Sequence, residues 1–144
     1  MLTLNNFLEK ILVLLPQAKE LYYRLILLVG PAGSGKTSLL QALSQKISTP
    51  VINLNLELSE RLLKIAEPQR VLCLPGILEE ICAQVQGDTV LLDNTELLFE
   101  PVLKHDPLRL LQRLSRKRTL VVSWNGKIKD RHLSFAEPEH PSIP

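Results

Sequence analysis

Apolar residues are spaced in two ways along this 144-residue chain, and the alternation between them predicts an α/β fold. Mainly apolar runs are typical of strands in a parallel sheet, which are covered on both faces. Three such runs are LILLV (25–29), TVLLD (89–93) and TLVVSW (119–124). A fourth run, VINLNL (51–56), alternates and therefore favours an edge strand, and HLSFA (132–136) predicts a short fifth one.

Segments with helical spacing lie between these runs. The expected helices span residues 3–15, 38–47, 60–66, 76–86 and 107–116.

Residues typical of helix ends flank several of these segments. Pro16 is expected to end the first helix, and Gly87 the fourth. Ser59 is a candidate N-cap, whereas Asp106 and Pro107 are typical of an N-cap and a first helical position.

We expect one domain over residues 1–144, with an N-terminal helix at 3–15, a core at 21–136 and a proline-rich tail at 137–144. The predicted fold has three layers around a mainly parallel sheet of about five strands. Ligands of such sheets bind beyond the carboxyl ends of the strands.

The composition, with 45% hydrophobic and 22% charged residues, is ordinary for a soluble domain. No apolar run approaches the ~20 residues of a membrane-spanning helix. The first residues lack the pattern of a secretory signal, so we expect a cytoplasmic protein without membrane contact. Cys73 and Cys82 lack metal-ligand spacing and are expected to be buried thiols, and His105, His132 and His140 to be surface residues.

The net charge of +2 hides an uneven distribution. Residues 104–132 contain nine Lys and Arg but only two Asp. This basic segment predicts a contact surface for DNA phosphates or for a protein partner, and both alternatives stay open.

A glycine-rich loop follows the first apolar run and is the strongest motif in the chain. Residues 30–37 match G-x-x-x-x-G-K-[ST], the phosphate-binding P-loop. Its glycines allow the backbone amides to form an anion nest, Lys36 supplies charge to the phosphates, and Thr37 is a ligand for Mg²⁺. The expected nucleotide contacts are Gly30, Pro31, Ala32, Gly33, Ser34, Gly35, Lys36, Thr37 and Ser38.

A second group of polar residues follows the later strands. VLLDN (90–94) resembles the Walker B element of P-loop NTPases, which assigns Asp93 to the Mg²⁺ shell. Related ATPases often carry Glu directly after this Asp, where this chain has Asn94. Glu96 is the nearest candidate base, with the first turn of a helix as the alternative role. Asn125 is either a sensor of the γ-phosphate or part of an Asn-Gly turn.

Arginines near the end of the last predicted helix have three alternative roles. They suit a helix C-terminus, they can complete a neighbouring subunit's site, or they can contact DNA phosphates. The candidates are Arg113, Arg116, Arg118 and Arg131.

The organisation favours an ATPase over a small-molecule kinase, because few residues remain after TLVVSW for a kinase lid. The strand at 51–56 separates the P-loop strand from the Asp93 strand along the chain. This resembles the additional-strand (AAA+-like) core of P-loop NTPases, without the helical domain that follows that core in AAA+ proteins.

Most of the chain, from about Leu21 to His140, resembles the BrxF family of small P-loop proteins from BREX (bacteriophage exclusion) anti-phage defence systems. The resemblance rests on RLILLVGPAGSGKT, INLNLELSERLL, VLLDNTELLFEPVLKHDPLRLLQRLSR, VVSWNG and FAEPEHP. It implies a bacterial or archaeal cytoplasmic protein that works with other BREX subunits.

Taken together, the sequence predicts an ATP- and Mg²⁺-dependent ATPase or assembly switch, with slow or partner-dependent turnover and self-association. A non-hydrolysing, nucleotide-dependent module that binds DNA or protein is the alternative, and a small-molecule kinase is a distant third. A P-loop contacts phosphates rather than the base, so adenine is expected from the family alone.

Overall fold

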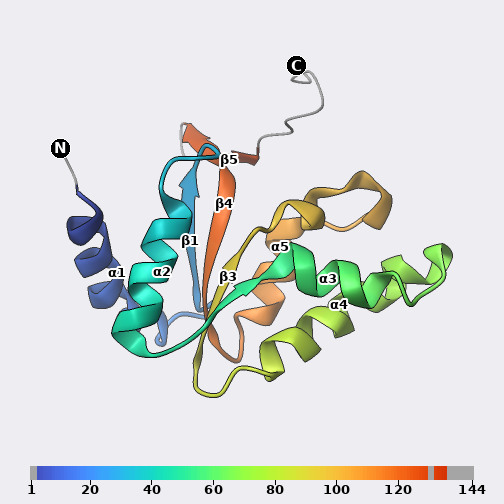
Figure 1. The fold of residues 1–144 in the computed structure, drawn as a ribbon, viewed down its shortest axis with the longest axis horizontal. Coiled ribbons are helices and arrows are strands. Elements are labelled where there is room, and N and C mark those ends of the chain that lie inside the picture. Colours follow the sequence, from blue (N-terminus) through green and yellow to red (C-terminus); the bar gives the residue numbers. More distant parts are fainter. Residues whose placement is uncertain (1–2, 130–131, 136–144) are drawn as a thin grey trace.

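The computed structural model describes residues 3–129 and 132–135. Over these residues, helices cover both faces of a central sheet, as predicted (Figure 1). In chain order the elements are α1 (Leu4–Ala18), β1 (Leu25–Gly30), α2 (Lys36–Ile47), β2 (Val51–Asn53), α3 (Leu54–Leu62), α4 (Glu67–Ala83), β3 (Thr89–Asp93), the 3-10 helices η1 (Glu96–Phe99) and η2 (Pro101–Leu103), α5 (Pro107–Leu114), β4 (Thr119–Lys129) and β5 (His132–Phe135).

The strand order of the sheet is β1-β4-β3-β2, and these strands are parallel. β5 pairs with β4 in the antiparallel direction. β4 therefore separates the strand before the glycine loop from the strand that ends at Asp93, which confirms the additional-strand arrangement. β2 lies at one edge, as predicted, but β1 lies at the other end of this order and is only partly buried. Side chains of β1 pack against the apolar cores on both faces of the sheet, as predicted, although the strand is less buried than β3.

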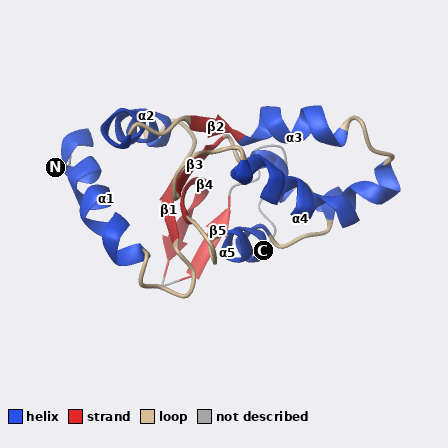
Figure 2. Ribbon diagram, turned by 90° about the horizontal axis from the view of Figure 1, so that it is seen from below, coloured by secondary structure: helices blue, strands red, loops and turns tan. Residues whose placement is uncertain are grey.

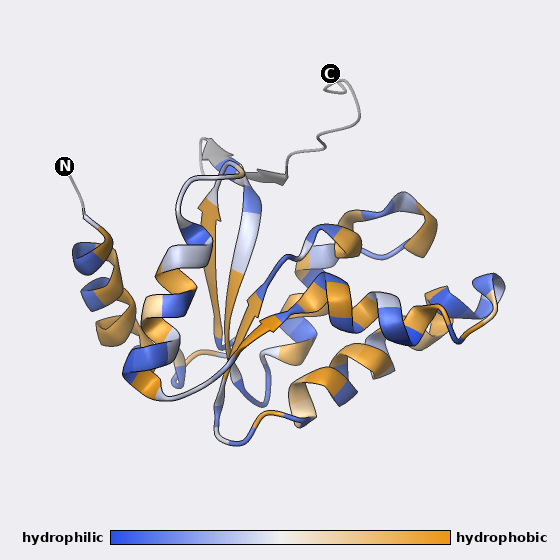
Figure 3. Ribbon diagram, viewed as in Figure 1, coloured by the Kyte–Doolittle hydropathy of each residue, from blue (hydrophilic) through white to orange (hydrophobic). Residues whose placement is uncertain are grey.

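Two apolar layers hold the helices against the sheet (Figures 2 and 3). α1 and α2 pack on one face through Leu8, Ile11 and Leu40, against side chains such as Leu91 of β3. The helices α3, α4 and α5 pack on the opposite face. Successive β3 side chains point to opposite faces, so an apolar run without alternation is what such a strand requires.

The alternating run at 51–56 forms only a short strand. β2 ends at Asn53, whose side chain accepts a hydrogen bond of 3.1 Å from the Leu56 amide and caps α3. Leu54 and Leu58 are buried at helical spacing along α3. Ser59, the predicted cap, lies inside α3.

Two helices continue through prolines: Pro16, which was expected to end the first helix, and Pro75, which lies inside a helix that begins earlier than the predicted residue 76. α1 passes Pro16 and ends at Ala18. α4 includes Pro75, which has no amide proton to donate to the carbonyl of Val71 four residues earlier. The ring nitrogen Nε2 of His105, 2.6 Å away, occupies that carbonyl instead. His105 is therefore a partly buried structural residue rather than a surface one.

The C-terminal half agrees with the sequence at one helix end and differs in a strand. Asp106 caps α5 as predicted, accepting hydrogen bonds from the Leu108 and Arg109 amides. β4 does not end at Asn125 and Gly126 but continues to Lys129, because residues beyond Asn125 pair with β5.

Within the part of the chain that the structure describes, no helix has the length and hydrophobicity needed to cross a membrane.

Candidate functional site

The glycine loop joins β1 to α2 and leaves backbone amides at the start of that helix without side-chain caps. Gly35 is the N-cap of α2 and has a φ of 99°, and Gly33 has a φ of 79°. Both values lie in the left-handed region that favours glycine. Because α2 begins with no side-chain hydrogen bond to its first amides, these amides and the helix dipole can bind an anion.

The Lys36 amine folds back over this loop. Its Nζ donates to the carbonyls of Gly30 and Pro31, at 2.9 and 2.7 Å, and to Ser34 Oγ at 3.2 Å. The pKa of Lys36 is lowered because burial disfavours the charged amine, and the charges of Asp93 and Glu96 offset part of this effect. A phosphate group would give this amine a stronger, charged partner than the carbonyls do.

Asp93 stands at the carboxyl end of β3 and is 6% exposed. Thr37 Oγ1 donates to its Oδ2 at 2.7 Å, and Ser123 Oγ donates to its Oδ1 at 2.7 Å. Thr95 Oγ1 in turn donates to the Ser123 carbonyl at 2.8 Å. The strands β3 and β4, the residue before η1 and α2 thus fix one carboxylate beside the hydroxyl of the P-loop.

Glu96 begins η1 and is held between two side-chain amides. Asn55 Nδ2 donates to its Oε2 at 2.6 Å, and Asn125 Nδ2 donates to its Oε1 at 3.0 Å. The carbonyl of the Asn55 side chain also accepts from the Leu97 amide at 2.8 Å. Glu96 is exposed, so its carboxylate remains open to water while its position is fixed.

Lys36, Thr37, Asp93 and Glu96 line one cavity of about 350 Å³ beyond the carboxyl ends of the parallel strands. The lining residues are Ala32, Gly33, Gly35, Lys36, Thr37, Ser38, Asp93, Asn94, Glu96 and Asn125. Of the other predicted contacts, Gly30, Pro31 and Ser34 belong to the same loop and supply the oxygen atoms that now hold Lys36.

We compared the sequence with models of known protein families. Residues 26–98 match the model of the ATPase family associated with various cellular activities (AAA). The chain belongs to this family. No curated protein and no solved structure matches it. AAA membership makes the domain a nucleotide-binding P-loop ATPase, for which ATP and a divalent metal are the expected ligands.

The donor set of this AAA domain fits Mg²⁺. Thr37 Oγ1 and Asp93 Oδ2 lie 2.7 Å apart and both residues line the cavity. Mg²⁺ in nucleotide sites commonly uses one or two protein oxygen ligands together with phosphates and water. Thr37 and Asp93 are therefore the residues that would hold it.

Three residues of the site were not assigned from the sequence. Asn55 was predicted to lie in a strand, but Asn53 ends β2, and Asn55 lies in α3 beside Glu96, which lines the cavity. The preference of Asn for N-cap positions is the signal that would have revealed this. Ser123 and Thr95 carry no local motif that distinguishes them from other buried hydroxyls.

Asn94 directly follows Asp93 and lines the cavity without supplying a carboxylate. Its φ of 53° turns the chain sharply, and its carbonyl accepts from the Asn55 amide at 2.8 Å. This turn places Glu96, rather than residue 94, beside Asn125.

The candidate arginines that the structure describes, Arg113, Arg116 and Arg118, lie away from the cavity of their own chain. Arg113 and Arg116 are near the start of β4, whereas the cavity lies beyond the opposite ends of the parallel strands. Arg116 stacks on the ring of Tyr22 at 3.8 Å, and Arg113 is exposed on α5.

The guanidinium of Arg118 is bound to main-chain carbonyls of its own chain. It donates to the carbonyl of Cys82, in the last turn of α4, and to that of Val85, just after the helix ends at Ala83. Arg131 lies outside the residues that the structure describes.

Proposed function

We propose that this AAA domain hydrolyses ATP with Mg²⁺ and that Glu96 is the general base. The observation that carries the proposal is the position of Glu96. It lines the same cavity as Lys36 and Asp93 and is fixed there by Asn55 and Asn125. A base must lie within hydrogen-bond reach of the water that it activates, and a base whose side chain is already fixed meets that requirement best.

In this proposal each residue of the cavity has a separate role. Amides of the glycine loop bind the phosphates, and Lys36 leaves the carbonyls of Gly30 and Pro31 to contact them. Thr37 and Asp93 hold Mg²⁺, which when bound neutralises charge on the phosphate oxygens. Glu96 accepts a proton from the attacking water.

Turnover is proposed to be slow or partner-dependent. Both oxygens of Glu96 already accept hydrogen bonds from amides. A water must share these oxygens with Asn55 and Asn125 or displace one of the amides. A second protein surface over the cavity would exclude bulk water and favour the productive arrangement.

The second candidate function is a nucleotide-dependent binding module without hydrolysis. Asn94 favours it, because a residue that can act as a base is missing directly after Asp93. Arg113 and Arg116 remain as exposed cations for DNA or an acidic protein surface, whereas Arg118 is occupied internally.

The resemblance to the BrxF family supports a role as a cytoplasmic subunit of a BREX anti-phage defence system. In that role we propose that the protein self-associates in response to nucleotide and contacts other subunits. Co-purification of the defence proteins with the tagged chain, with and without Lys36→Ala, tests this role separately from hydrolysis.

The direct test of the enzymatic proposal compares Mg-ATP binding and phosphate release in the same samples. Glu96→Gln should bind Mg-ATP with nearly unchanged affinity and release phosphate at least about 100-fold more slowly. Lys36→Ala should lose most of its nucleotide binding. Glu60→Gln, which changes an exposed carboxylate of α3, is the matched control and should behave like the wild type.

If Glu96→Gln releases phosphate as fast as the wild type, Glu96 is not the base. Tight Mg-ATP binding by a wild-type protein that releases no phosphate, alone or with its partners, would support the binding module instead.

A further inference from the structure

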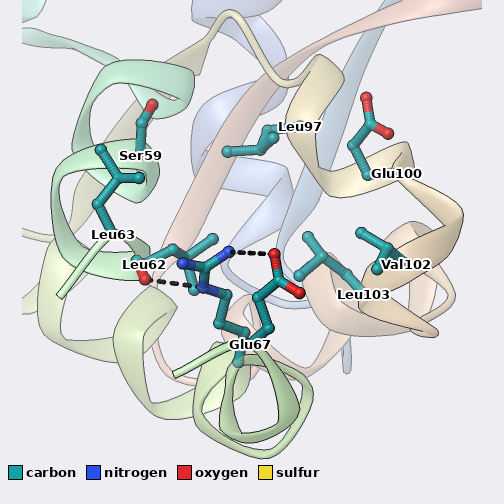
Figure 4. Close-up of a pocket in the computed structure, with 9 residues that line it drawn as sticks. Ser59, Leu62, Leu63, Glu67, Leu97, Glu100, Val102 and Leu103 are labelled. Carbon is teal, nitrogen blue, oxygen red and sulfur yellow. Dashed lines mark hydrogen bonds and ion pairs between the residues drawn. The ribbon is translucent and has the colours of Figure 1, made fainter. Parts of the chain in front are cut away.

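A second cavity lies between α3, α4 and the 3-10 helices, on the face of the sheet opposite α1 and α2 (Figure 4). Its volume is about 260 Å³, and apolar side chains form most of its lining. We call it the α3–α4 groove; it is lined by Ser59, Leu62, Leu63, Glu67, Arg70, Leu97, Glu100, Val102 and Leu103. Small-molecule sites usually measure about 300–1,000 Å³, so the groove suits one or two side chains of a protein better than a free ligand.

The charged residues at the groove favour a basic occupant. Glu67 and Glu100 are exposed. Arg70 is already used, because its Nε donates to the carbonyls of Leu62 and Ile65 at 2.9 and 3.0 Å. Its guanidinium also lies 3.8 Å from Glu67. An apolar segment that carries a positive charge therefore complements the groove, and an acidic segment does not.

The exposed face of α1 has this chemistry. α1 packs on the core through Leu8 and Ile11, yet Phe7 and Leu14 are 43% and 42% exposed. Lys10 lies between these two at helical spacing, so Phe7, Lys10 and Leu14 share one face.

We propose that α1 of a second copy of this chain docks in the α3–α4 groove, with Phe7 and Leu14 in the groove and Lys10 beside its carboxylates. Both views of the fold place α1 and the α3–α4 pair at opposite ends of the molecule, so each copy offers its helix to a neighbour (Figures 1 and 2). Such a head-to-tail contact uses two different surfaces and builds rings or filaments. This inference rests on the self-association proposed above and identifies its interface.

The groove is connected to the nucleotide cavity through adjacent residues. Leu97 lines the groove, whereas its neighbour Glu96 lines the nucleotide cavity. Ser59 of the groove donates to the main-chain carbonyl of Asn55, whose side chain binds Glu96. A nucleotide that repositions Glu96 thus acts on the wall of the groove, and association should depend on Mg-ATP.

The test uses one variant of each surface and measures mass by light scattering across protein concentrations with Mg-ATP. Phe7→Asp puts a charge into the apolar docking face of α1. Val102→Lys puts a positive charge in the groove, where it repels the positive charge of the docking Lys10. Phe7 is 43% exposed and Val102 is 69% exposed, so neither change should prevent folding, which circular dichroism verifies. Each variant should need at least roughly tenfold more protein than the wild type to associate.

Matched controls carry the same charges on other faces. Asn5→Asp alters an exposed position of α1 on the side away from Phe7, Lys10 and Leu14, and Leu72→Lys alters α4 outside the groove. Both should associate like the wild type.

Mixing Phe7→Asp with Val102→Lys gives the decisive result. One intact helix and one intact groove remain in the mixture, so the head-to-tail contact predicts pairs of one copy of each variant that grow no further. Wild-type association that survives both single changes would overturn this interface while leaving self-association in place. A wild type that stays monomeric with Mg-ATP would overturn both, and phosphate release from the same samples still decides the enzymatic proposal.

Discussion

The side-chain amide of Asn125 donates a 3.0 Å hydrogen bond to Glu96, and thereby joins the middle of β4 to the start of η1 at the nucleotide cavity. Asn55 binds the other oxygen of the same carboxylate at 2.6 Å. Glu96 is therefore positioned by residues from two other elements, and its geometry depends on both amides. This arrangement allows a carboxylate that does not directly follow Asp93 to reach the same cavity.

Asn55 is predicted to position Glu96 rather than to contact ATP. Asn55→Ala removes the bond to Glu96 and the one that its carbonyl accepts from the Leu97 amide. We expect kcat to fall about tenfold or more while KM changes little, because a displaced base affects the transition state more than binding. Steady-state phosphate release measures both constants.

Asn94→Gly is the control for Asn55, since it removes another amide side chain from the cavity at a backbone φ of 53° that glycine tolerates. A positioning role for Asn55 is contradicted if both variants lower kcat equally, or if Asn55→Ala raises only KM.

Gly30 is predicted to be required by its contact with Ser34 rather than by its backbone conformation. A Cβ at position 30 would lie 2.6 Å from Ser34 Oγ but 3.4 Å from Ser34 Cβ. Gly30→Ala should therefore displace Ser34 and weaken Mg-ATP binding at least roughly tenfold, since the loop amides must keep their geometry to bind phosphate. Titration calorimetry measures the affinity.

The double variant Gly30→Ala/Ser34→Ala tests the cause directly. Removing the Ser34 hydroxyl leaves an ordinary contact, so the double variant should bind Mg-ATP nearly as well as Ser34→Ala alone. If the double variant is as defective as Gly30→Ala, the Ser34 contact is not the reason.

The sequence alone was enough to predict those features for which residue chemistry and spacing fit only one structure. The glycine loop, Asp93 at the end of an apolar run, and the Asp106 cap were predicted and lie where expected. The prediction of a strand over all of residues 51–56 was wrong, because the apolar positions there fit both the strand period and the helix period. Ile52 and Leu54 alternate as in a strand, while Leu54 and Leu58 follow helical spacing, and the side chain of Asn53 decides the boundary.

Other features depend on contacts between distant residues and have no local signal. α4 includes Pro75 because His105, far along the chain, satisfies the carbonyl of Val71. Asn125 and Gly126 resemble a turn, yet β5 keeps that segment in the sheet. The bond between Asn55 and Glu96 spans 41 positions and follows from where α3 begins.

Arg118 is predicted to contribute to stability. Its guanidinium binds the carbonyls of Cys82 and Val85, and without it these partly buried acceptors lose their partner. Arg118→Ala should lower the free energy of unfolding by about 1–3 kcal/mol, measured by urea denaturation. Arg118→Lys should not restore it fully, because one ammonium cannot reproduce the geometry of the guanidinium.

The exposed Arg113 provides the comparison, and Arg113→Ala should change stability by less than about 0.5 kcal/mol. Equal stabilities of Arg118→Ala and the wild type would show that the two carbonyl contacts contribute nothing. Any test of DNA binding should therefore use Arg113 and Arg116, whose replacement leaves these two carbonyl contacts intact.

Cys82 is predicted to make the fold sensitive to alkaline pH. Burial raises the pKa of its thiol to about 11 from 9.0; Arg118 opposes this shift and Glu79 adds to it. The folded state therefore holds the proton more tightly than the unfolded state. The stabilisation is fully present below about pH 9 and is lost as the pH rises through about 11. At pH 11 the loss should amount to roughly 2 kcal/mol, because one pKa unit corresponds to about 1.4 kcal/mol.

Urea unfolding under reducing conditions at pH 7 to 11 measures this loss when the wild type is compared with Cys82→Ala. All other ionisable groups are common to both proteins, so the difference between their two pH profiles isolates the thiol. The wild type should lose stability more steeply than Cys82→Ala above pH 9. Parallel profiles would mean that the thiol titrates alike in the folded and unfolded states, and that burial at the end of α4 does not protect its proton.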